Sequence, residues 1–60
     1  MSSFRDQVIA KMKKLGYEYD ELNSYPHNIQ FNSDSISTFF PMQFKSWADA
    51  NDWADNVVID

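Results

Sequence analysis

His27 is the only histidine in the sequence, and it is the first side chain to consider for general acid–base chemistry. An imidazole acts as a base only when a partner orients it within a pocket, and the nearest carboxylates along the chain are Asp20 and Glu21. Pro26 and Asn28 flank the histidine and place it in a loop, and a domain this small has little room for a pocket. We therefore expect His27 to have no catalytic role.

Asp49, Asp52 and Asp55 recur at three-residue intervals, so on a helix they form an acidic stripe. Carboxylates at this spacing could contact a hard cation, but side chains on one straight helix do not wrap around an ion, and the sequence lacks a calcium-binding loop. A solvated helix face is the simpler interpretation. As a functional surface the stripe suits docking to a basic protein partner better than metal binding, so we expect no metal and no cofactor.

Trp47 and Trp53 could stack on the bases of single-stranded nucleic acid. The aspartates around them would repel phosphate, and both rings fall on the apolar arc of their segment, which predicts a place in the core or at its rim. The single glycine excludes a glycine-rich phosphate loop, and no Gly-x-Ser-x-Gly motif occurs. Without a catalytic constellation, we do not expect the chain to be an enzyme.

The composition limits both stability and function. The chain has 60 residues, no cysteine and a net charge of −4. One domain over residues 1–60 is expected, and it must rely on a compact core because neither disulfides nor a metal cluster can support it. Residues 1–16 carry four basic and one acidic side chain, whereas residues 17–60 carry one basic and eight acidic side chains. This balance argues against direct nucleic-acid binding.

No run approaches the roughly 18 apolar residues of a membrane span, and the first residues lack the apolar stretch of a secretory signal. These features predict a cytoplasmic location and no membrane contact. The run Phe44-x-Ser46-Trp47-x-Asp49-Ala50-x-x-Trp53 is similar to segments of small bacterial or bacteriophage proteins without an assigned function. That resemblance favours the same location and implies nothing about activity.

Two segments carry the signature of amphipathic helices. Residues 3–15 begin with Ser3 and Asp6 in the spacing of a capping box and end before Gly16, where a left-handed cap is expected. Residues 47–58 follow Ser46 as an N-cap, with apolar side chains on one face. We predict a helix over each range.

The middle of the chain predicts a β-hairpin. Residues 28–32 alternate polar and apolar side chains, and residues 36–40 are rich in β-formers, with Pro41 expected to end the second strand. For residues 17–26 the sequence allows three structures: an irregular loop, a helical turn or a third short strand. The order helix, hairpin, helix predicts an α+β domain with both helices on one face of a small antiparallel sheet.

The apolar pattern also predicts a core and an exposed patch. The expected core comprises Phe4, Val8, Met12, Leu15, Ile29, Phe31, Trp47, Ala50, Ala54 and Val57. Neighbouring residues of a regular strand face opposite sides, so Phe39 and Phe40 cannot both point inward. We expect a patch that includes Phe39 or Phe40 and Met42, and it would bind a partner or a second copy in a weak homodimer.

These features together favour a small acidic protein-interaction module, such as an adaptor, a regulator or an inhibitor of a larger protein. The candidate partner-binding residues are Phe39, Phe40, Met42, Asp49, Asp52 and Asp55. The alternative is a nucleic-acid mimic, whose acidic part would occupy the basic groove of a DNA- or RNA-handling enzyme.

Overall fold

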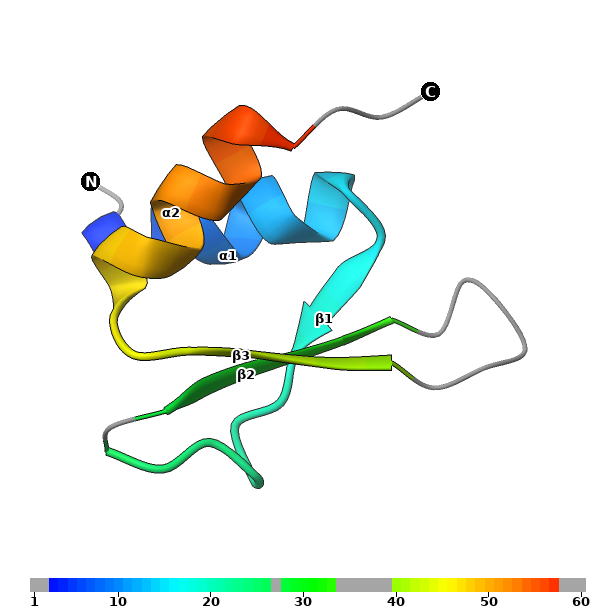
Figure 1. The fold of residues 1–60 in the computed structure, drawn as a ribbon, viewed down its shortest axis with the longest axis vertical. Coiled ribbons are helices and arrows are strands. Elements are labelled where there is room, and N and C mark those ends of the chain that lie inside the picture. Colours follow the sequence, from blue (N-terminus) through cyan, green and yellow to red (C-terminus); the bar gives the residue numbers. More distant parts are fainter. Residues whose placement is uncertain (1–2, 27, 34–39, 58–60) are drawn as a thin grey trace.

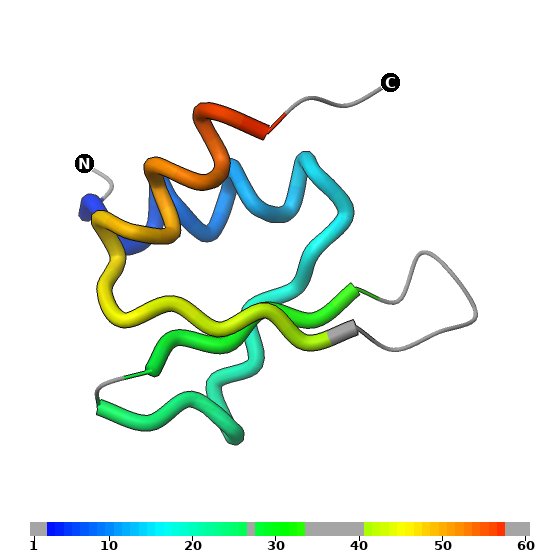
Figure 2. The backbone as a smooth tube through the Cα atoms, viewed as in Figure 1, coloured from blue at the N-terminus to red at the C-terminus, as the bar shows by residue number. Residues whose placement is uncertain are grey.

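Two helices cover one face of a three-stranded antiparallel sheet (Figure 1), which confirms the predicted α+β class. The computed structural model describes residues 3–26, 28–33 and 40–57. Along the chain the elements are α1 (Phe4–Lys14), β1 (Tyr17–Tyr19), β2 (Ile29–Ser33), β3 (Phe40–Phe44) and α2 (Trp47–Asn56). The helices are the first and last of these elements, and they run side by side in the same direction, so both begin at the same end of the molecule (Figure 2).

The ends of α1 follow the predicted capping chemistry. The hydroxyl of Ser3 accepts a hydrogen bond from the backbone N–H of Asp6 at 3.1 Å, which satisfies a donor that the first helical turn leaves free. Gly16 then adopts a φ of 94°, which is a left-handed conformation. Glycine adopts it at little energetic cost because it has no Cβ. This turn directs the chain from α1 straight into β1.

Helix α2 is capped in the same way but ends earlier than predicted. The hydroxyl of Ser46 accepts from the N–H of Asp49 at 3.1 Å. Val57 is already extended, with φ −71° and ψ 137°, so the helix ends at Asn56 rather than at residue 58. Acidic side chains and no basic ones occupy its last turns, and they oppose the helix dipole, which explains the early end. Val58 lies outside the described residues.

The sheet has the order β1-β2-β3, so the third-strand alternative for residues 17–26 is the correct one for Tyr17–Tyr19. The strand predicted over 28–32 is present as β2, and residues 36–39 of the other predicted strand lie outside the described residues. The strand that pairs with β2 is β3, so the prediction that Pro41 ends a strand was wrong. Because β3 lies at the edge of the sheet, it tolerates a residue without an N–H where the donor would point away from β2.

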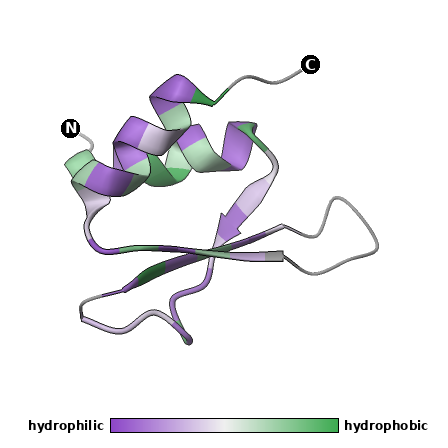
Figure 3. Cartoon of the chain, viewed as in Figure 1, coloured by the Kyte–Doolittle hydropathy of each residue, from purple (hydrophilic) through white to green (hydrophobic). Residues whose placement is uncertain are grey.

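The core lies between the sheet and the helices. Tyr19, Phe31 and Met42 are partners across the three strands and share the face that the helices cover. The residues fully or nearly buried there are Val8, Met12, Ile29, Phe31, Ala50 and Ala54, all of which were predicted. Figure 3 shows apolar residues alternating with polar ones around both helices.

The other four residues of the predicted core are less buried than expected. Leu15, Trp47 and Val57 are half-buried, and Leu15 and Trp47 pack against the buried cluster. The prediction that Phe4 belongs to the core was wrong, because this residue is 50% exposed. It is the first residue of α1, where the helix begins at the end of the layer and leaves its outermost ring partly uncovered.

Candidate functional site

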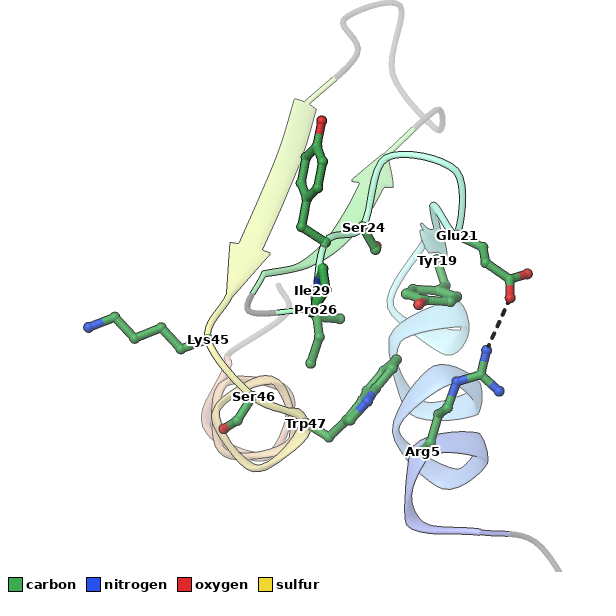
Figure 4. A pocket seen from close by; sticks show the side chains of 10 residues that line it. Arg5, Tyr19, Glu21, Ser24, Pro26, Ile29, Lys45, Ser46 and Trp47 are labelled. Carbon is green, nitrogen blue, oxygen red and sulfur yellow. Dashed lines mark ion pairs between the residues drawn. The ribbon is translucent and has the colours of Figure 1, made fainter.

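A groove of about 550 Å³ opens where the starts of both helices meet the end of β1 and the loop that comes after it. Arg5 comes from the first turn of α1, Tyr19 from the end of β1, and Trp47 from the start of α2. Tyr25 and Pro26 form a further wall from the loop before β2, and Pro26 is labelled in Figure 4. Three parts of the chain that lie far apart in the sequence, at residue 5, within 19–29 and at 45–47, therefore build one concave surface.

The rings of Tyr19 and Trp47 form the aromatic part of the groove. Their centroids lie 5.2 Å apart at an interplanar angle of 56°, and each ring also contacts the buried ring of Phe31, at 5.6 Å and 6.0 Å. Contacts of this geometry stabilise aromatic pairs beyond their buried area. The two half-buried rings are thus held in place from below by the core while one side of each borders the groove.

Arg5 covers these rings from the side of α1. Its guanidinium carbon lies 5.4 Å from the Tyr19 centroid and 5.8 Å from the Trp47 centroid, within the range of a cation–π interaction. The same group lies 3.8 Å from carboxylate oxygens of Glu21 and Asp6. All three charged side chains are substantially exposed, so these ion pairs orient Arg5 more than they stabilise the fold (Figure 4).

The carboxylate of Asp20 organises the loop that forms the opposite wall. It accepts hydrogen bonds from the N–H and the side-chain amide of Asn23, at 3.1 and 2.7 Å, and from the amide of Asn32 at 2.8 Å. The hydrogen bonds from the Asn23 and then the Asn32 side chain lower the pKa of Asp20, because they favour its charged form. Asn32 is buried, so this contact also satisfies its amide inside the protein.

Ser24 ties the same loop to β2. Its hydroxyl donates to the carbonyl of Asp20 at 2.6 Å and accepts from the N–H of Gln30 at 3.0 Å. Tyr25 and Asn28 exchange backbone hydrogen bonds at 2.9 and 3.0 Å and close a tight turn. The loop therefore holds Tyr25 and Pro26 at the edge of the groove through hydrogen bonds at both of its ends.

One exposed large apolar side chain of the described residues lines this groove, that of Tyr25, which is 70% exposed. Leu22 and Phe4 are also exposed, and they neighbour the lining residues Glu21 and Arg5 in the chain without lining the groove themselves. Exposed apolar surface next to a concave aromatic site is typical of protein-binding surfaces.

The predicted acidic stripe lies on α2, and its three aspartates are exposed. The carboxylate of Asp55 is not free, because the ammonium of Lys11 binds it at 2.8 Å and the amide of Asn51 lies 3.3 Å away. Within residues 3–26, 28–33 and 40–57, no three His, Cys, Asp or Glu side chains are placed to hold a metal ion together. Asp49 and Asp52 remain as the solvated part of the stripe.

The predicted aromatic patch is only partly described. Phe39 lies outside the described residues, as does His27, and of Phe40 the backbone alone is described, at the start of β3. Met42 is half-buried and packs against the core. The patch stays a prediction, and Met42, its described side chain, does not line the groove.

The groove itself was not predicted from the sequence. The alternation Tyr17-x-Tyr19 and the pair Tyr25-Pro26 were the available signals, but they fell in the segment whose structure the sequence left open. Among the described residues, neither helix has the length and apolarity to cross a membrane. Comparison of the chain with protein-family models, curated proteins and solved structures gave no match. Any function assigned to the chain must therefore rest on the geometry of the groove and the charges around it.

Proposed function

We propose that the chain is a non-enzymatic protein-interaction module that binds a larger protein through the groove, as an adaptor, a regulator or an inhibitor. The observation that supports this proposal best is the concave aromatic surface formed by Tyr19, Tyr25 and Trp47. Tyr25 is also one of the exposed large apolar side chains of the described residues. A partner that covers the groove would remove this aromatic surface from water.

The chemistry of the lining supports binding in the same way. Aromatic side chains supply large contact areas at little cost in conformational entropy, and Trp, Tyr and Arg dominate the energetics of protein interfaces. Trp47, Tyr19 and Arg5 already hold one another in a fixed arrangement, so little ordering is required when a partner binds.

A site-specific cross-linking experiment tests this proposal. A photoreactive p-benzoylphenylalanine replaces Tyr25 in the groove and, in a matched protein, replaces Asp52 on the exposed face of α2. After irradiation in lysate of the source organism, we expect a specific adduct from position 25 that is absent from position 52. An adduct from position 52 alone would reject the groove as the binding surface.

The nucleic-acid mimic is the second candidate, and the exposed carboxylates of Asp49 and Asp52 support it. The contact of Lys11 with Asp55 weighs against it, because it neutralises one charge of the stripe. A mimic would bind a basic protein with strong salt dependence, and an Asp49→Asn, Asp52→Asn double variant would lose that binding. For the groove proposal, the same variant is expected to bind like the parent.

A further inference from the structure

We propose that the groove takes an extended, proline-containing segment of the partner protein, with an acidic residue beside the proline. This inference rests on the proposed function and adds the conformation and chemistry of the occupant. Proteins recognise peptides mainly as helices in grooves, as strands added to a sheet edge, or as polyproline II segments on aromatic surfaces. The structure favours the third of these modes over the other two.

The lining suits an amphipathic helix poorly. A docked helix lays an apolar face into a hydrophobic groove. Here charged and hydroxyl side chains lie among the rings, namely Arg5, Glu21, Ser24, Lys45 and Ser46. The groove holds about 550 Å³ and is closed on one side by the loop that Asp20 and Ser24 anchor. An extended chain of a few residues fits a volume of this size.

Strand addition finds only a short edge at the groove. The nearest strand, β1, is an edge strand of three residues. In the loop that follows it, the N–H groups of Tyr25 and Asn28 already donate to each other's carbonyls. We therefore place the main contacts of the occupant on the rings and side chains of the groove rather than on a backbone ladder.

The aromatic rings offer what a polyproline II segment needs. Such a segment has no internal hydrogen bonds, and its carbonyls point outward as acceptors. The indole N–H of Trp47 and the hydroxyls of Tyr19 and Tyr25 donate no hydrogen bond to any residue that the structure describes. Trp and Tyr donors usually find a partner when their rings are covered, so the three polar groups are suited to the carbonyls of an extended segment.

The charges at the rim of the groove are the reason for placing an acidic residue in the bound segment. Arg5 already has carboxylates of Glu21 and Asp6 at 3.8 Å, so its charge is largely offset. Lys45 lies at the rim opposite Arg5, and Figure 4 shows its side chain extending outward, away from the rings. Its ammonium has no carboxylate within ion-pair distance among the described residues. An acidic side chain of the bound segment would supply that missing partner.

Three peptides test the inference by NMR on the ¹⁵N-labelled protein. The first is an oligoproline that ends in two aspartates, the second has lysines in place of the aspartates, and the third has Gly-Ser repeats in place of the prolines. We expect the first peptide alone to shift the indole N–H resonance of Trp47. The indole of Trp53, which packs against Tyr17 and Phe44 in the core layer, is the internal control and should not move.

Three variants sharpen the test. Lys45→Glu should weaken the aspartate peptide roughly two- to fivefold and improve the lysine peptide. Lys13→Glu makes the same charge change at an exposed site on α1 and should leave both affinities nearly unchanged. Trp47→Phe keeps a ring but removes the indole donor, and it should weaken the first peptide roughly two- to tenfold.

Equal shifts from the Gly-Ser peptide would overturn the proline requirement, and equal binding of the lysine peptide would overturn the acidic one. If no peptide perturbs Trp47 while the cross-linker at position 25 still captures a partner, the inference fails and the proposed function stands. If the cross-linker also captures nothing, both fail.

Discussion

The ammonium of Lys11 on α1 lies 2.8 Å from a carboxylate oxygen of Asp55 on α2. The same ammonium donates to the side-chain carbonyl of Asn51 at 2.6 Å, so one lysine contacts two successive turns of the neighbouring helix. The contact links α1 to α2, and it is the reason that one of the three exposed carboxylates of the acidic stripe is already paired.

Removing this lysine should have a small effect on stability. Both side chains are about half exposed, so Lys11→Met is expected to cost at most about 1 kcal/mol, which corresponds to a fall in Tm of about 4–8 °C at most. Lys13→Met is the matched control, because Lys13 is exposed on the same helix and makes no ion pair with a described residue. A larger loss, measured by thermal circular dichroism, would mean that Lys11 also contributes to packing.

Phe31 is the aromatic residue on which the core depends. It is fully buried and contacts the rings of Tyr19, Phe44 and Trp47. Phe31→Ala should cost about 3–5 kcal/mol, comparable to the whole stability of a small domain, and leave the chain largely unfolded. Trp47→Ala should cost less, because Trp47 is only half-buried. Equal urea midpoints for the two variants would contradict this order.

Acid should destabilise the loop beside the groove through Asp20. Its pKa is below the ordinary value of 3.8, so the charged form is favoured in the folded state. That stabilisation is complete above the unfolded-state pKa and is lost as the pH falls through the lower, folded-state pKa. Asp20→Asn removes this contribution. The difference in Tm between the parent and the variant should therefore be largest near neutral pH and should shrink as the pH falls to about 2. Thermal melts across this pH range measure it.

Pro41 should limit pairing between copies of the sheet. It lies in the edge strand β3 and removes one backbone donor from the free side. Pro41→Thr restores that donor and is expected to increase self-association in sedimentation velocity across a concentration series. The parent should be a monomer or a weak homodimer in the same series. An unchanged sedimentation coefficient for the variant would show that this edge is protected by something else.

Much of the fold could be predicted because its signals are local. Ser3, Gly16 and Ser46 mark helix ends through contacts within one turn, and the structure has a cap at each of them. The position of β3 depended on a different property, its place at the edge of the sheet, which decides whether a proline is tolerated. Sequence alone does not state which strand lies at an edge.

The groove could not be predicted for a related reason. Arg5, Tyr19 and Trp47 are separated by many residues, and only the packing of α1, β1 and α2 brings their side chains together. Each of these residues has an ordinary explanation within its own element. The sequence pattern therefore drew attention to the acidic stripe, whose spacing is visible along one helix, and not to the groove.

The pairing of α1 with α2 also has a consequence for biosynthesis. The helix that packs beside α1 is made after all three strands, and β2, at the centre of the sheet, is flanked by β1 before it and β3 after it in the chain. While the ribosome still holds α2 in its exit tunnel, α1 has no helix to pack against, and an isolated helix of 11 residues is marginal in water. The domain must therefore fold after α2 has left the tunnel, as one cooperative unit, and a nascent chain stalled before Trp47 emerges should be fully sensitive to protease.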